Sequence, residues 1–151
     1  MAQWHRLMHA TPQEVWSVLS DPRQYGRWVV GAHRSWPRGG GWPAEGAELG
    51  YALRAGPWTY HGRTVSRRCE PPHRLELEAK SGVGSARIAF RIDPWGEDTL
   101  VVMDEHPLAG LAAGWHNAVV DALLRWRHRS ALARLSEVVE SAAKAEARAH
   151  A

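Results

Sequence analysis

The feature that most constrains this chain is a long amphipathic stretch near its C-terminus, from residue 107 to about residue 140. Read at helical spacing, it presents one apolar stripe made of Trp115, Val119, Ala122, Leu123 and Trp126. A second apolar stripe beside it contains Val120, Leu124, Ala131, Leu135 and Val138. The polar side holds Asp121, Arg125, His128, Arg129 and Ser136. No proline follows Pro107 in this run, so we expect one helix about 45 Å long.

A helix of this length needs a large apolar partner, because one short neighbour cannot cover its stripes. The residues upstream read mainly as strands, so the expected partner is a curved sheet that wraps the helix. In this arrangement Trp126 is buried against the sheet, and Trp126→Ala is expected to lower the free energy of unfolding by roughly 3–5 kcal/mol. A functional site would then lie between the helix and the sheet.

The start of the chain reads as a strand followed by two short helices. Residues 3–10 alternate as a strand does. Thr11 then has the position of an N-cap, with Pro12 at the first helical position and Glu14 at the third, which is a capping box. A second short helix is expected over residues 23–28.

Further strands are predicted between the short helices and the long one. They cover residues 29–36, 47–55, 57–69, 74–80, 86–92 and 99–106. Pro107 is expected to end the last of them. Arg67 and Arg68 interrupt the alternation of their strand and indicate a bulge, which leaves open whether Arg63 or Arg68 faces inward.

These elements predict an α+β fold with a single domain over residues 1–151. Seven antiparallel strands in consecutive hairpins form a bent sheet around the long C-terminal helix, and two short helices follow the first strand. The chain is long enough for one domain with its own core. Residues 142–151 are rich in alanine and charge, and we expect them to fray.

Composition argues against several classes of protein. The net charge of +3 is spread thinly, so nucleic-acid binding is not expected. No apolar run reaches the roughly 20 residues that cross a bilayer. The N-terminus lacks the features of a signal peptide, so we expect a cytoplasmic protein. The single cysteine, Cys69, and the scattered histidines favour neither a metal site nor a cofactor.

The order of elements and several local sequences together resemble a known superfamily. The matching segments are residues 10–16, residues 21–28, Gly46 before a strand, residues 70–72 before a strand, and residues 99–105 before the long helix. They resemble the START/Bet v 1-like (SRPBCC) superfamily, and within it the bacterial polyketide cyclase/dehydrase and lipid-transport group. The resemblance implies a helix-grip fold, whose cavity holds lipids, sterols, polyketides, hormones or quinones in relatives.

The aromatic residues are the best candidates for a ligand site. Nine tryptophans against one phenylalanine is an unusual excess, and large flat side chains suit a pocket that holds a ring or a lipid-like skeleton. The predicted ligand-binding residues come from different elements that the fold brings around one space. They are Trp28, Trp36, Tyr51, Trp58, Tyr60, Phe90, Met103, Glu105, Trp115 and Val119.

Glu105 is the most informative charged residue. If Val101 and Met103 face inward, Glu105 does so too, while Asp104 and His106 point outward. The adjacent carboxylates are then on opposite faces and cannot form a catalytic pair. A buried carboxylate is costly unless it has a partner. Glu105 is therefore a clamp on the strand end, a polar group facing the ligand, or a proton-transfer group.

The function predicted from these residues is a binding or carrier module for a mostly apolar small molecule, either aromatic or lipid-like. The alternative is a polyketide aromatase/cyclase or dehydratase in the same cavity. That enzyme would need inward polar groups, and the candidates are Glu105, Tyr51, Tyr60 and one of Arg63 and Arg68. No catalytic residue is assigned, because no diagnostic set of such groups matches position by position.

A third alternative concerns the second apolar stripe of the long helix. Val120, Leu124, Ala131 and Leu135 could form the surface for a homodimer or for another protein partner.

Overall fold

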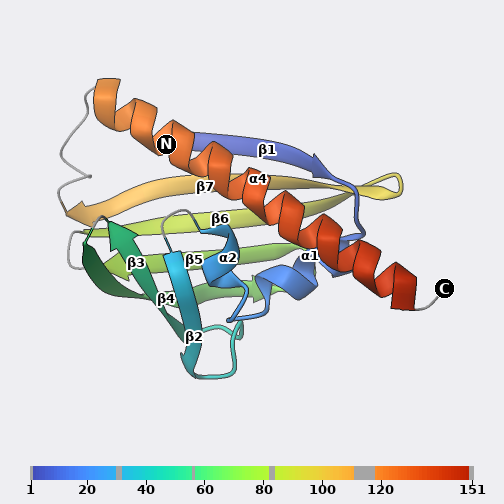
Figure 1. Ribbon diagram of the computed structural model, residues 1–151, viewed down its shortest axis with the longest axis horizontal. Coiled ribbons are helices and arrows are strands. Elements are labelled where there is room, and N and C mark those ends of the chain that lie inside the picture. The colour runs from blue at the N-terminus through green and yellow to red at the C-terminus, as the bar shows by residue number, and fades with distance from the viewer. Residues whose placement is uncertain (1, 30–31, 56, 82–83, 111–117, 150–151) are drawn as a thin grey trace.

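The structure is a computed structural model of the chain, and the described residues are 2–29, 32–55, 57–81, 84–110 and 118–149. The elements follow one another in the predicted order (Figure 1). They are β1 (Ala2–Met8), α1 (Pro12–Leu19), α2 (Tyr25–Trp28), β2 (Ala32–Gly39), β3 (Glu48–Ala55), β4 (Trp58–Glu70), β5 (Arg74–Ser81), β6 (Gly84–Trp95), β7 (Asp98–Gly110) and α4 (Ala118–Ala149).

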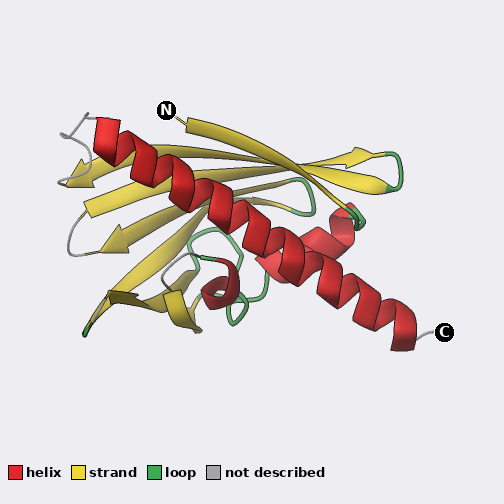
Figure 2. Ribbon diagram, turned by 45° about the horizontal axis from the view of Figure 1, so that its top comes forward, coloured by secondary structure: helices red, strands yellow, loops and turns green. Residues whose placement is uncertain are grey.

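The strands of the described residues form one seven-stranded antiparallel sheet in the order β1-β7-β6-β5-β4-β3-β2. α4 crosses one face of this sheet diagonally, as both ribbon views show (Figures 1 and 2). α1 and α2 also contact α4, so the three helices share that face. The predicted helix-grip arrangement, with two short helices after the first strand, is confirmed.

The inner face of the sheet, which α4 covers, carries the apolar core. Leu75 and Leu77 on β5 are fully buried there, and burial of such a side chain contributes about 1.5–3 kcal/mol. Glu76 and Glu78, between and after them, lie on the outer face. Glu78 pairs there with Arg67 at 2.9 Å. The alternation predicted for this strand is therefore confirmed.

The capping box predicted at the start of α1 is present. Thr11 Oγ1 accepts a hydrogen bond from the Glu14 N–H at 3.2 Å, and the Thr11 N–H donates to Glu14 Oε1 at 2.9 Å. Pro12 occupies the first turn, where a missing N–H costs nothing. Val15 and Leu19 then enter the core. The local sequence thus determines where α1 begins.

The bulge predicted in β4 is also present, because the register against β5 shifts between Ser66 and Arg68. The extra residue lets Arg67 and Arg68 both lie on the outer face. Arg63 lies there too, and Arg63 and Arg68 each pair with a glutamate, at 3.1 and 3.0 Å. The expectation that one of these two arginines faces inward is therefore wrong.

β7 is longer than predicted, because it continues past Pro107 to Gly110. The register of β7 against β6 shifts between Ser85 and Ala86, and Pro107 lies opposite Ala86. Proline lacks an N–H for the ladder, and such an irregularity is where a strand tolerates it. The prediction that Pro107 ends the strand is therefore wrong, and α4 is described from Ala118.

α4 buries Ala131 and Leu135 of the predicted second stripe, together with residues that the pattern did not place there. The first predicted stripe lies outside the residues whose side chains the structure describes. Leu132, Leu135 and Val139 are buried at a spacing of three and four residues, and so is Ser136. Placing Ser136 on the polar side was therefore wrong. Ala131 and Leu135 are buried within this chain, so they cannot form the partner surface of the third alternative. α4 packs against β1, α1 and α2.

The C-terminal residues continue α4 to Ala149, and the expectation that the chain frays from residue 142 stays a prediction. Alanine, glutamate, lysine and arginine are strong helix formers, and Ala143 packs against the core. The side chains of residues 118–129, including Trp126, lie outside the described part of the structure. The destabilisation expected for Trp126→Ala stays a prediction.

Candidate functional site

Four buried aromatic side chains meet on the inner face of the sheet, and we call them the aromatic wall: Tyr25, Trp28, Tyr51 and Phe90. The ring centroids of Tyr25 and Trp28 are 5.1 Å apart, and those of Trp28 and Phe90 are 5.6 Å apart, both edge to face. Tyr25 and Tyr51 lie 5.7 Å apart in a tilted arrangement. Such pairs stabilise by about 0.5–1.5 kcal/mol beyond their area burial. The wall joins α2 to β3 and β6.

α2 directs two of these rings because Tyr25 and Trp28 are three residues apart, on one side of a single helical turn. Between them, the Gly26 N–H donates to Ser35 Oγ at 2.8 Å. This bond attaches α2 to β2 at a fixed height above the sheet. Both rings therefore reach the inner face.

Gly62 on β4 makes room for Tyr51 on the neighbouring strand. The two residues are register partners, and a Cβ at position 62 would collide with the Tyr51 ring and hydroxyl. The hydroxyl donates to the Lys80 carbonyl at 3.3 Å, on the far side of β4. The ring of Tyr51 thus lies across β4, which only a glycine permits.

Polar groups accompany the aromatic wall. Thr64, fully buried on β4, donates from Oγ1 to the Tyr25 hydroxyl at 3.0 Å. On β7, Met103 is the register partner of Phe90 and Glu105 is the partner of Ile88. Glu105 is only 9% exposed. The inner face therefore combines flat rings, an adaptable thioether and one buried carboxylate.

The structure brings together five of the predicted ligand-binding residues. Trp28, Tyr51, Phe90, Met103 and Glu105 are all buried on the side of the sheet that faces α4. The predicted inward direction of Glu105 is confirmed, as is the outward direction of its neighbours in sequence, which are half-buried. Trp115 and the side chains of Trp58, Tyr60 and Val119 lie outside the described part of the structure.

Trp36 does not belong to this site, and its placement in the ligand set was wrong. It is the register partner of Gly50, on the outer face, whereas Ser35 pairs with Tyr51 on the inner face. A Cβ at position 50 would come within 2.6 Å of the indole, so the ring packs directly on the glycine backbone. Arg34 also lies over the indole, 4.9 Å from the ring centroid.

Two members of the site escaped the sequence reasoning, Tyr25 and Thr64. Tyr25 carried a usable signal, since it precedes Trp28 by three residues in a predicted helix. Thr64 carried none, because a buried threonine is recognisable only from the hydroxyl it contacts. The register across two strands provides that contact, and a single sequence does not specify it.

The site offers little for nucleophilic or metal chemistry. Burial raises the pKa of the Cys69 thiol, with a smaller contribution from Glu45. The thiol is therefore protonated at neutral pH and a poor nucleophile. Within residues whose placement the structure describes, no three His, Cys, Asp or Glu side chains group as metal ligands. What the arrangement suits is contact with an apolar molecule.

The amino-acid sequence itself indicates the family of the protein. It matches the family described as "Polyketide cyclase / dehydrase and lipid transport" over residues 5–140. The chain belongs to this family. Membership supports a ligand-binding or cyclase role in general terms. No curated protein matches the sequence.

Solved structures share the fold at low sequence identity. A START superfamily protein from Mycobacterium smegmatis has a TM-score of 0.75 and 16% identity, covering 93% of this chain and 97% of that one. Ara h 8.0201 has a TM-score of 0.72 and 6% identity, with 93% and 97% covered. DynU16, a protein of the dynemicin biosynthetic locus, has a TM-score of 0.68 and 18% identity, with 92% and 46% covered. The predicted START/Bet v 1-like fold is confirmed.

No helix in the described ranges combines the length and the apolar character needed to cross a membrane.

Proposed function

We propose that the protein binds or carries a mostly apolar small molecule, aromatic or lipid-like, between the inner face of the sheet and α4. The observation that carries this proposal is the aromatic wall, with Met103 and Glu105 on the same face. Flat rings provide contact area at low cost in conformational entropy. The flexible side chain of a methionine adapts to the shape of a ligand. The family description, which includes lipid transport, supports the same function.

The test is a search for bound molecules, followed by a titration. Native mass spectrometry of gently purified protein should detect a retained ligand. Anilinonaphthalene sulfonate, whose fluorescence rises in apolar sites, should bind and be displaced by palmitate or by a polycyclic aromatic compound. The absence of both a retained species and saturable dye binding would overturn the proposal.

A pair of variants locates the binding. Phe90→Leu removes a ring of the aromatic wall and keeps an apolar side chain of similar size. It should therefore weaken binding of the polycyclic compound more than binding of palmitate. Trp95→Leu is the matched control, because Trp95 lies at the β6–β7 hairpin and is 62% exposed. Equal effects of the two substitutions would place binding elsewhere on the molecule.

The cyclase alternative has one observation in its favour, the buried carboxylate of Glu105. A carboxylate at an apolar wall can move a proton. An enzyme of this kind would use basic groups on the inner face to steer a poly-ketone chain. Arg63 and Arg68 were the candidates, and both lie on the outer face. Incubation with a linear poly-β-ketone thioester decides between the two functions. Release of a cyclised aromatic product that depends on Glu105 would establish the enzyme.

A further inference from the structure

The indole N–H of Trp28 is a buried donor that has no acceptor among the described residues. Trp28 is 3% exposed, so water does not supply one freely. An indole N–H is a donor only, and buried tryptophans usually find it a partner. Leaving such a group unsatisfied costs about 1–3 kcal/mol. A donor of this kind calls for an explanation by function.

Among the described residues, the surroundings of Trp28 do not provide the acceptor. Its closest ring contacts are Tyr25 and Phe90, both arranged edge to face. Two hydroxyl groups that contact α2 serve other bonds: Ser35 Oγ accepts from the Gly26 N–H, and Thr64 Oγ1 donates to the Tyr25 hydroxyl. The two side chains in ring contact with the indole thus meet it through their aromatic rings, and neither hydroxyl group accepts its N–H.

We propose that Trp28 is the specificity-determining donor of the ligand site, and that its N–H binds an acceptor oxygen on the ligand. This inference rests on the proposed function. It narrows the ligand to a flat ring system bearing a carbonyl or a comparable acceptor. A plain hydrocarbon of the same shape would fill the wall and leave the N–H unsatisfied. A site built to make a hydrogen bond discriminates against an analogue that lacks the group.

Two ring compounds of nearly equal shape test the inference, 9-fluorenone and fluorene. They differ only in a carbonyl in place of a methylene group. The wild-type protein should bind fluorenone about tenfold more tightly than fluorene. Trp28→Phe keeps an aromatic ring and removes the N–H, so the ratio of the two dissociation constants should fall to about one. The ratio of the dissociation constants is the readout, because the smaller ring of phenylalanine weakens binding of both compounds alike.

Trp16→Phe is the matched control. Trp16 is buried on α1, so the same chemical change is made in the same core cluster. No ring contact of the described residues joins Trp16 to the aromatic wall. This variant should keep the tenfold preference for fluorenone. Loss of the preference in both variants would mean that general loosening of the core is responsible, which contradicts the role of Trp28.

A second measurement does not depend on any variant being stable. In ¹⁵N-labelled wild-type protein, the indole proton of Trp28 should shift downfield on addition of fluorenone and exchange with water more slowly. Fluorene should not produce this shift. If the chemical shift of the Trp28 indole proton does not change on addition of fluorenone, the inference is overturned. The indole N–H would then be held by the ring of Phe90 or by another fixed group.

The outcomes separate the inference from the function on which it rests. If both compounds bind equally well and Trp28→Phe leaves their ratio unchanged, the protein binds rings but Trp28 does not select them. If neither compound binds the wild-type protein, the proposed function fails for ligands of this size, and the role of Trp28 fails with it.

Discussion

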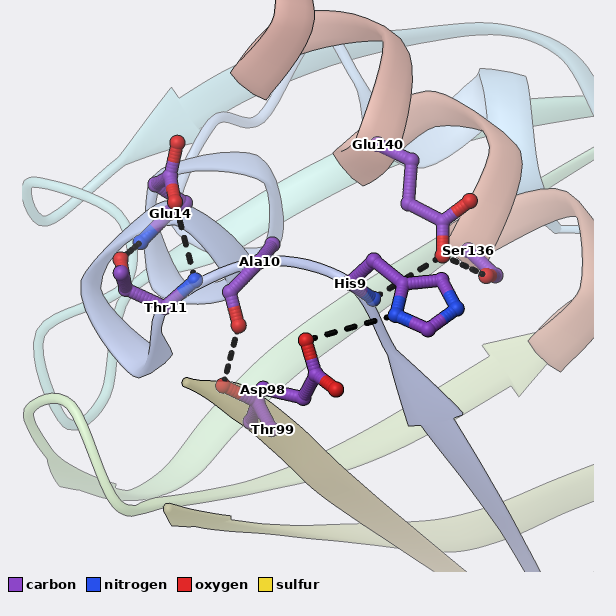
Figure 3. Close-up of polar contacts among 8 residues, drawn as sticks. All are labelled: His9, Ala10, Thr11, Glu14, Asp98, Thr99, Ser136 and Glu140. Carbon is purple, nitrogen blue, oxygen red and sulfur yellow. Dashed lines mark hydrogen bonds and ion pairs between the residues drawn. The ribbon is translucent and has the colours of Figure 1, made fainter. Parts of the chain in front are cut away.

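The aromatic wall and the region around His9 differ in how their hydrogen-bond donors are satisfied. The region around His9 joins β1, α1, β7 and α4, and we call it the polar junction (Figure 3). It consists of His9, Ala10, Thr11, Glu14, Asp98, Thr99, Ser136 and Glu140. Its donors find acceptors within the chain, whereas the indole N–H of Trp28 in the aromatic wall finds none among the described residues.

Glu140 is the centre of the polar junction. Its Oε1 accepts from the His9 N–H at 3.0 Å and from Ser136 Oγ at 3.4 Å. His9 Nδ1 also lies 3.3 Å from Asp98 Oδ1. These contacts hold the C-terminal half of α4 to the end of β1. They also explain why Ser136 is tolerated in a buried position.

Thr99 completes the junction by donating from Oγ1 to the Ala10 carbonyl at 2.7 Å, beside the capping box of Thr11. All of these bonds close within the chain, as expected for a structural anchor. On the aromatic wall the Trp28 indole N–H is buried without an acceptor among the described residues, as a donor that serves a ligand would be. The comparison sets donors that are satisfied within the chain against one buried donor, the Trp28 indole N–H, that has no acceptor among the described residues. Four predictions test it, in order of decreasing effect.

The largest effect is expected in the aromatic wall itself. Phe90→Ala should lower the free energy of unfolding by about 3–5 kcal/mol, because it empties a fully packed position between Trp28 and Met103. Urea denaturation measures this loss. Trp95→Ala, at an exposed position, should change stability little. A small loss for Phe90→Ala would show that the wall is loosely packed.

The next effect concerns Glu105. Glu105 is buried, so its carboxylate does not point into bulk water. Two roles then remain for it, contact with the ligand and a structural clamp. If it contacts the ligand, Glu105→Gln should weaken binding of a ligand donor by about 1–3 kcal/mol and leave the melting temperature nearly unchanged. If it is a clamp, Glu105→Gln and Glu105→Ala should both lower the melting temperature of the empty protein. Glu97→Gln, at an exposed position, is the control.

A smaller effect is expected in the polar junction. Glu140→Ala should lower the free energy of unfolding by about 1–2 kcal/mol, because the His9 N–H loses its acceptor. Ligand affinity should not change. Glu137→Ala, one turn earlier and exposed, should have little effect on either quantity. A loss of affinity in Glu140→Ala with stability intact would make the junction part of the site.

The smallest effect is expected on the outer face. The hydrogen bond from Arg67, followed by that from Lys80, holds the pKa of the Glu78 carboxyl below its usual range. A lowered folded pKa means stabilisation at pH above about 4.3, the ordinary glutamate value, that is lost as the pH falls through the folded pKa. Since such a pair is near the surface, Glu78→Gln should cost only a few tenths of a kcal/mol at pH 7. Melting temperatures of variant and wild type should converge at a pH below the lowered pKa of Glu78; a constant difference would contradict the assignment.

How much of the site was predictable differs from residue to residue. Met103 and Glu105 follow from the two-residue period of β7, since every second residue shares a face. Tyr51 and Phe90 follow from the same rule in their strands. Trp36 was misplaced because apolar character alone does not tell which face a residue occupies. The partner of Trp36 is a glycine, and the space above Gly50 on the outer face accepts the indole.

The sequence by itself determined the order of elements, the start of α1 at its capping box, the faces of β5 and β7, and the bulge near Arg67. These depend on contacts between residues close in the chain, or on a period that any sheet imposes. The tertiary structure decided the extension of β7 past Pro107, the burial of Ser136 on α4 and the meeting of Trp28 with Phe90. Each of these depends on surfaces that are far apart in sequence, and only their packing selects one arrangement.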